Sequence, residues 1–172
     1  NKRDRVNITL SSMRHVMAAL NFPEGSLDIL EEAVRAAEEL GDRAAVARLY
    51  GLTGLAHSWA GHTDESLKLT QKAFDEAEKL GDEPGVLGIA QSLCNVYFNY
   101  GEAARVADVA ARSIALLEKT QRVPSAAVPE FDQYVVLLYL LGSARAMLGD
   151  FDEAEKQSQK ALSLAQEIRS QY

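Results

Sequence analysis

The chain has 172 residues, of which 47% are hydrophobic and 25% charged, and its formal net charge is -7. This length and composition suit a folded globular domain rather than a disordered segment. The acidic balance argues against direct nucleic-acid binding, which needs clustered Lys and Arg to neutralise phosphates. The lone Cys94 leaves no internal disulfide, and no run approaches the roughly 18 apolar residues of a membrane span. We expect a cytoplasmic protein that does not enter a membrane.

A period of 40 residues runs through most of the chain. The tripeptide Leu40–Asp42 recurs as Leu80–Asp82, and the turn residues Asn21, Gly61 and Gly101 keep the same spacing. Glycine can take the left-handed conformation that ends a helix, and Asp can cap the first amides of the next helix. Each recurrence therefore predicts the end of one helix and the start of another.

Between these turns, apolar residues follow helical spacing, and no window alternates as a strand would. The predicted helices, in chain order, lie near residues 4–20, 23–40, 43–60, 64–80, 84–100, 102–119, 128–148 and 151–170. The turn at Gly149 comes 48 residues after Gly101, so the last period is eight residues longer than the others. The extra residues fall around Val123–Ser125 and Val128–Pro129, where a longer loop is expected.

Residues at fixed positions within each period resemble the tetratricopeptide repeat (TPR), a helix hairpin of about 34 residues. Repeat two carries the matching residues Tyr50, Gly54, Gly61, Ala73 and Phe74. Repeat four carries Leu141, Gly142, Gly149, Phe151, Ala154 and Ala161. Small residues recur because the two helices of a hairpin approach closely only where side chains are short. The 40-residue period resembles a subclass found in bacterial signalling and transcription regulators and in polarity adaptors.

The resemblance implies an all-α fold, a right-handed α-solenoid of about four antiparallel helix pairs in a TPR-like superhelix. A single domain, 1–172, would contain repeats near residues 4–42, 43–82, 83–122 and 127–172. Repeats one and three depart from the pattern. Arg14 takes the small-residue position of repeat one, and Val106 and Ser113 replace alanines of repeat three. Those two hairpins should therefore pack more loosely or tilt differently.

In the family, the first helix of each pair lines a concave groove, so the resemblance implies a partner-binding face on those helices. The candidate residues are Ser11, His15, Arg48, Leu55, Ser58, Trp59, Gln91, Asn95, Phe98, Asn99, Tyr139 and Ser143. Gln and Asn amides can satisfy the backbone of an extended peptide, while Trp59, Phe98 and Tyr139 offer large rigid contact areas. The alternative is that these aromatic side chains pack in the core between adjacent helix pairs.

The sequence predicts no catalytic set, no cofactor and no metal site. His57 and His62 are five positions apart, whereas two ligands on one helix face need a spacing of three or four, so surface or packing histidines are expected. The segment Gly51–Gly54 lies within a predicted helix and is interpreted as a close-packing contact rather than a phosphate loop. Cys94 is expected to be buried and inert. We therefore expect a protein that is not an enzyme.

The predicted function is a protein-interaction scaffold that binds a peptide or helix, within a signalling or regulatory protein. The alternative is a regulatory domain that senses a small ligand or peptide, as in a bacterial transcription regulator, cyclase or ATPase. A closed apolar pocket would favour a small ligand, and an open groove a peptide. The chain starts without Met and ends directly after the fourth pair, which predicts a piece of a larger protein. Leu162, Leu164 and Ile168 would then need cover from further repeats or from self-association.

Overall fold

The computed structural model describes residues 1–20, 22–119 and 130–169, without the side chains of 130–132 and 168–169. Within these ranges the chain is built from eight helices and contains no strand. It divides into two compact units, Asn1–Val96 (unit 1) and Tyr97–Tyr172 (unit 2), and each is described by itself. The boundary between the units falls inside a helix, and the division into four repeats of one domain stays a prediction.

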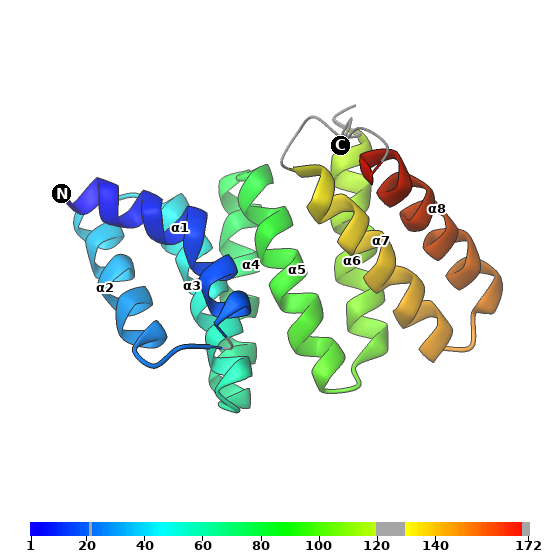
Figure 1. Ribbon diagram of the computed structural model, residues 1–172, viewed down its shortest axis with the longest axis horizontal. Helices are drawn as coiled ribbons and strands as arrows, with labels where there is room; N and C mark the ends of the chain where they lie inside the picture. Colours follow the sequence, from blue (N-terminus) through cyan, green and yellow to red (C-terminus); the bar gives the residue numbers. More distant parts are fainter. Residues whose placement is uncertain (21, 120–129, 170–172) are drawn as a thin grey trace. The chain divides into compact units, whose positions relative to one another are not determined.

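Unit 1 contains the helices α1 (Lys2–Ala19), α2 (Ser26–Glu39), α3 (Arg43–Trp59) and α4 (Thr63–Leu80), and most of α5 (Glu83–Asn99). Helix α1 lies against both α2 and α3, and α3 packs against α2 and α4 (Figure 1). The contact between α1 and α2 is less extensive than that between α3 and α4. This difference agrees with the looser packing or different tilt expected for repeat one.

The turns of unit 1 follow the recurring Leu-Gly-Asp. Gly81 has a φ of 64° and ends α4, because a left-handed residue lets the following amide turn back onto the helix. The Asp82 N–H then donates to the Ala77 carbonyl at 3.1 Å. Asp42, at the preceding turn, accepts a hydrogen bond from the Ala45 N–H at 3.0 Å and so caps α3. These local interactions place the helix ends where the sequence predicts them.

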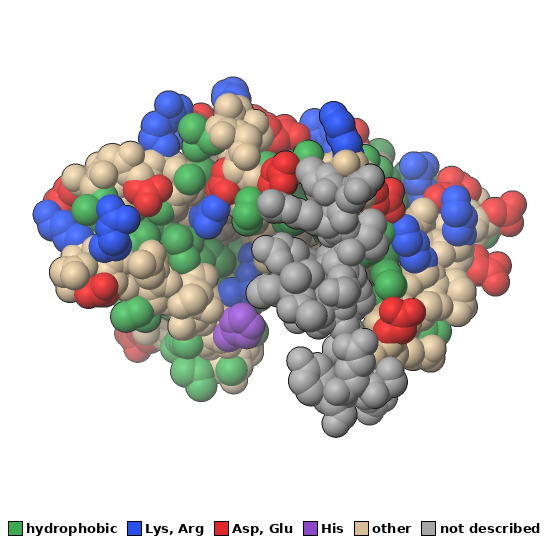
Figure 2. All heavy atoms as spheres, turned by 90° about the horizontal axis from the view of Figure 1, so that it is seen from above, with side chains coloured by type: hydrophobic (Ala, Val, Ile, Leu, Met, Phe, Trp, Pro, Cys, Tyr) green, Lys and Arg blue, Asp and Glu red, His purple; other side chains and the backbone are tan. Residues whose placement is uncertain are grey.

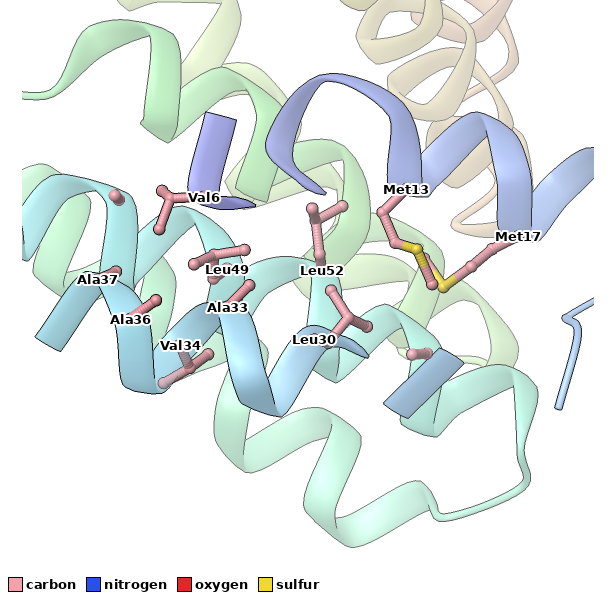
Figure 3. Close-up of a cluster of buried hydrophobic side chains, with 12 residues drawn as sticks. Val6, Met13, Met17, Leu30, Ala33, Val34, Ala36, Ala37, Leu49 and Leu52 are labelled. Carbon is pink, nitrogen blue, oxygen red and sulfur yellow. The ribbon is translucent and has the colours of Figure 1, made fainter. Parts of the chain in front are cut away.

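The core of unit 1 is made by three helix faces that meet. Figure 3 shows Met13 and Met17 of α1 pointing toward Leu30 of α2 and Leu52 of α3, and all four side chains are buried. Helix α2 is strongly amphipathic, with its apolar residues at helical spacing, so it presents a single side to this cluster. Burial of one such large apolar side chain contributes about 1.5–3 kcal/mol. The cluster therefore holds α1 to α3 together.

Unit 2 contains α6 (Ala103–Lys119), α7 (Glu130–Met147) and α8 (Phe151–Arg169), and α7 packs against both of its neighbours. Tyr134 of α7 is fully buried, and its hydroxyl donates to Glu118 Oε1 of α6 at 2.9 Å. Lys160 Nζ of α8 donates to the same oxygen at 2.8 Å. This polar cluster joins all three helices.

The predicted helix ends that fall on described residues agree with the structure to within three residues. The longer loop expected around Val123–Ser125 and Val128–Pro129 lies outside the described residues. Of the side chains expected to need cover at the end of the chain, Leu162 is 51% exposed and Leu164 is partly buried. The side chain of Ile168 lies outside the described residues.

Candidate partner-binding face

Glycines set the spacing of the helices that carry the candidate residues in unit 1. A Cβ atom on Gly54 of α3 would lie 2.3 Å from Thr70 Oγ1 of α4, and one on Gly51 would lie 2.8 Å from Ile89 Cγ1 of α5. The segment from Gly51 to Gly54 is therefore a close-packing contact, as predicted. It brings α3 close to α4 on one side and to α5 on the other.

Arg14 connects the first helix of unit 1 with the fifth. Its Nη2 atom donates to the Gly88 carbonyl at 3.0 Å and to the Ser92 hydroxyl at 2.9 Å, so the side chain extends from α1 to α5. The face of α1 that enters the core runs through Met13 and Met17 instead. The repeat pattern places Arg14 only at the contact between the two helices of its hairpin, so Arg14 is not among the binding-face residues predicted from the sequence.

The environment of Arg14 contains no carboxylate from the described residues within ion-pair distance. Burial is the cause that lowers the pKa of its guanidinium. An arginine has five N–H donors, of which Arg14 directs two at α5. The remaining donors can bind a carbonyl or carboxylate of a partner.

Arg48 of α3 forms an ion pair within unit 1. Its Nε donates to Asp82 Oδ2 at 2.7 Å, and its Nη2 donates to Asp82 Oδ1. The hydrogen bond to Asp82 is the main cause that raises the pKa of Arg48. A Cβ atom on Gly85 would lie 2.0 Å from Asp82 Oδ2, so the glycine leaves room for this pair. A partner would have to compete with Asp82 for Arg48.

Trp59, the only tryptophan, is 42% exposed at the end of α3. It borders a recess of about 500 Å³ together with Met17, Ala18 and Phe22. Phe22 has a φ of 59°, and its N–H donates to the Met17 carbonyl at 2.8 Å, which turns its side chain toward the α1–α3 core. Trp59 is therefore an exposed aromatic side chain at the edge of a recess, rather than a core residue.

The remaining candidates in unit 1 differ in exposure. Ser11 and His15 are exposed on α1, and Ser58 is half-buried on α3. Gln91 and Asn95 are half-buried on α5. The helical spacing of three and four residues places both amides on the side of α5 that holds Gly88 and Ser92, the acceptors of Arg14.

Leu55 is a correction to the predicted binding face. Only 2% of its surface is exposed, so it packs in the core and cannot contact a partner in this conformation. The sequence pattern could not reveal this, because α3 lies between neighbours and is buried on more than one side.

The candidates in unit 2 are the last residues of α5 and one face of α7. Phe98 is half-buried and Asn99 is exposed. Tyr139 is 58% exposed and Ser143 is half-buried, four residues apart on α7. Tyr139 and Ser143 therefore share a face of one helix, whereas only part of the Phe98 side chain is accessible to a partner.

A second recess, of about 430 Å³, lies among α2, α3 and α4. Its charged rim is largely paired, because Arg43 binds Glu76 and the Tyr50 hydroxyl donates to Glu38 at 3.2 Å. Lys72 Nζ lies 5.3 Å from the centre of the Tyr50 ring. A partner at this recess would have to replace these contacts, which makes the Trp59 side the better candidate.

His57 and His62 form a pair that sequence analysis missed. Their Nδ1 atoms are 3.2 Å apart and their ring centroids are 5.4 Å apart. Burial, followed by the neighbouring His62, lowers the pKa of His57. His62 is exposed and His57 is half-buried, in agreement with the expectation of surface or packing histidines. Their contact with each other was not predicted, and it arises because Gly61, with a φ of 80°, turns the chain back between them.

Cys94 has the buried environment predicted for it. Cys94 is completely buried, and burial raises the pKa of its thiol to about 12, which makes it unreactive as predicted.

In the described ranges, no helix combines the length and apolar character needed to cross a bilayer. Figure 2 shows acidic and basic side chains interspersed over the visible face, so neither sign forms a continuous field there.

The fold defines the class of protein, an all-α TPR-like repeat domain. Solved structures with the same arrangement of helix pairs include BtubC (BKLC) from P. vanneervenii, with a TM-score of 0.72 and 16% identity. That match covers 90% of this chain and 61% of BtubC. This chain therefore spans less than two thirds of that protein.

A Podosopora anserina kinesin light chain with nearly identical TPR-like repeats is also similar. Its TM-score is 0.66 at 15% identity, and the match covers 96% of this chain and 76% of the other. Likeness at this identity shows the fold alone. No protein-family model matches the sequence, and no curated protein matches it.

Proposed function

We propose that this chain is a non-enzymatic interaction module, and that unit 1 binds a peptide or helix of a partner protein. The proposed face consists of Arg14, Trp59, Gln91 and Asn95. TPR-like repeats are generally protein-interaction scaffolds, which supports this role. A cytoplasmic location and a place within a signalling or regulatory protein rest on the sequence resemblance and are part of the proposal.

The observation that carries this proposal is the position of Arg14. A guanidinium that is substantially removed from water and has no carboxylate neighbour among the described residues retains unused donors. Such donors bind carbonyl and carboxylate oxygens well, because hydrogen bonds from a charged donor are short and strong. The half-buried amides of Gln91 and Asn95 on α5 add donors and acceptors that suit a peptide backbone.

Trp59 would provide the apolar contact. A partly exposed Trp at the edge of a recess is typical of residues that contribute most to binding energy, because its large rigid ring loses little conformational entropy. An apolar side chain of the partner would enter the recess beside Phe22.

The experiment selects short peptides from a random displayed library against the purified chain. Selected peptides should change the fluorescence of the lone Trp59 and should lose at least tenfold in affinity with Arg14→Gln or Asn95→Ala. The matched control is Lys72→Ala, at the second recess, which should bind as wild type does. Selected peptides that keep their affinity for both face variants and lose it with Lys72→Ala would contradict the proposal.

A small-ligand sensor is a second candidate, because the recess beside Trp59, about 500 Å³, has the volume of a ligand site. A screen of small apolar compounds by Trp59 fluorescence tests it. Saturable binding of a compound that Trp59 and Phe22 substitutions abolish, while Asn95→Ala has no effect, would favour the sensor over the peptide-binding module.

Self-association is also proposed, through exposed apolar residues of unit 2. Met147 is 53% and Phe151 is 71% exposed around the turn between α7 and α8. Exposed apolar clusters of this kind commonly mark contacts with other proteins. Sedimentation of the chain at increasing concentration should reveal a dimer that Phe151→Ser weakens, and a monomer at all concentrations would count against it.

A further inference from the structure

The turn between α3 and α4 brings the side chains of His57 and His62 to one place. Helix α3 ends at Trp59, and Gly61 follows in the left-handed conformation. The His62 N–H donates to the His57 carbonyl at 2.9 Å, the bond that joins the residue after the glycine to the third residue from the helix end. In such turns this pair of positions frequently makes an apolar contact, but here both positions carry imidazoles.

The distance between the two imidazoles suits a shared metal ion. Zn²⁺ binds histidine nitrogen at about 2.0–2.1 Å, and two nitrogens at that distance subtend an angle of about 100° at the ion when they lie 3.2 Å apart. An angle of about 100° falls between the ideal values for octahedral and tetrahedral sites. Both nitrogens can therefore reach one ion once each ring turns its Nδ1 lone pair away from the other ring and toward the ion.

The electrostatic surroundings are compatible with a cation. Glu65 and Glu31 are the acidic residues whose charges act on His57. Both carboxylates therefore lie close enough to stabilise positive charge at this turn. Without a metal, the same geometry would hold one Nδ1–H···Nδ1 hydrogen bond, which is the alternative to be tested.

We propose that His57 and His62 form a two-imidazole site for a divalent late first-row transition ion, Zn²⁺, Ni²⁺ or Cu²⁺, bound through both Nδ1 atoms. The described residues contain no group of three or more His, Cys, Asp or Glu that could hold a metal, so water completes the coordination. Imidazole is a good ligand for all three ions, and affinity should follow the order Cu²⁺ above Ni²⁺ and Zn²⁺. The ion would clip the end of α3 to the start of α4.

Calorimetric titration of the chain, freed of any histidine tag, with NiCl₂ and with ZnCl₂ tests the site. One ion should bind per chain and should raise the thermal midpoint, because a ligand that binds only the folded state stabilises it. His57→Gln and His62→Gln should each weaken binding at least tenfold. His15→Gln is the matched control, because it removes the third and last histidine, which is exposed on α1.

A second measurement identifies the ligand atoms. In long-range ¹H–¹⁵N spectra of labelled histidine, Zn²⁺ should shift both Nδ1 signals of the pair and leave both Nε2 atoms protonated. Circular dichroism of the two Gln variants should match that of wild type. The site is refuted if both Gln variants bind Ni²⁺ as tightly as wild type, or if saturating Zn²⁺ leaves the Nδ1 signals unchanged.

Discussion

In each of the hairpins α3–α4 and α7–α8, a glycine on the first helix lets the second helix approach closely. A Cβ atom on Gly54 would meet Thr70 Oγ1 at 2.3 Å, and one on Gly142 would meet Ser158 Oγ at 2.6 Å. In each hairpin the glycine and its neighbour are separated by 16 positions. The difference lies in burial, because Thr70 is completely buried in unit 1, whereas Ser158 is exposed in unit 2.

The same sequence pattern is therefore expected to contribute differently to stability in the two units. The Ser158 hydroxyl can rotate toward water when a larger residue replaces Gly142. Thr70 cannot move so easily, since its hydroxyl donates to the Ser66 carbonyl inside the core. The same contrast applies to the ion pairs, because Asp82 in unit 1 is 9% exposed, whereas Glu118 in unit 2 is 43% exposed.

The largest effect is expected for Gly54→Ala, which should lower the free energy of unfolding by about 3 kcal/mol, against about 1 kcal/mol for Gly142→Ala. Alanine otherwise favours a helix over glycine by about 1 kcal/mol, so destabilisation reports the steric contact. Urea unfolding followed by circular dichroism measures both. Adding Thr70→Ala to Gly54→Ala should recover part of the loss. Equal decreases in the free energy of unfolding for the two variants would show that burial of the contact does not determine its cost.

The ion pairs come next in magnitude. Asp82→Asn should cost about 2 kcal/mol, because it removes a charge-assisted double hydrogen bond to Arg48 in a mostly buried setting. Glu118→Gln should cost about 0.5–1 kcal/mol, because the pair with Lys160 is largely solvated. Thermal unfolding at low and high salt should show a smaller salt effect for the Asp82 pair. The opposite ranking would contradict the comparison.

The two units should also respond to acid in different pH ranges. The folded-state pKa of His57 is lowered, so its contribution to stability is present above the ordinary histidine range and is lost as the pH falls through it. The pKa of Glu118 is lowered mainly by Lys160, so its contribution is lost only at more acidic pH, below the ordinary carboxylate range. Thermal midpoints should be measured against pH. The decrease near the histidine range should be smaller in His57→Gln than in wild type, and the decrease at more acidic pH should be smaller in Glu118→Gln. Unchanged profiles in the two variants would contradict these assignments.

The smallest effect concerns the reactivity of Cys94. Because its thiol is buried and its pKa is raised to about 12, alkylation should proceed only when unit 1 opens. Gly54→Ala should therefore speed labelling, whereas Gly142→Ala, in unit 2, should leave the rate nearly unchanged. Mass spectrometry after timed exposure to iodoacetamide measures this, and equal acceleration by both variants would show that the units do not open separately.

Much of the fold was predictable, because its signals are local. Gly81 and Asp82 end one helix and begin the next through contacts within a few residues, so their recurrence was enough to place the helices. Gly54 and Gly142 marked the close approach within each hairpin. The TPR-like class followed from these positions, and the solved structures confirm it. The narrower resemblance to regulators and polarity adaptors stays a prediction.

The candidate site was less predictable, because its residues depend on contacts between distant segments. Leu55 is buried since α3 has neighbours on several sides, which a single helix period cannot show. Arg14 donates hydrogen bonds to residues more than 70 positions away. Its place in the repeat pattern indicates only a contact with the other helix of its own hairpin. The contact between His57 and His62 depends on the left-handed Gly61 between them and on the direction in which each ring then points, which the sequence does not reveal.

The sequence alone determined where the helices begin and end and which small residues let them approach, because capping and steric size act over short distances along the chain. Only the tertiary structure decided where the Arg14 guanidinium lies, that Leu55 is buried and that two imidazoles meet at Gly61. Those outcomes depend on the rotation of each helix against its neighbours and on the direction of each turn. Both are set by the packing of the whole unit.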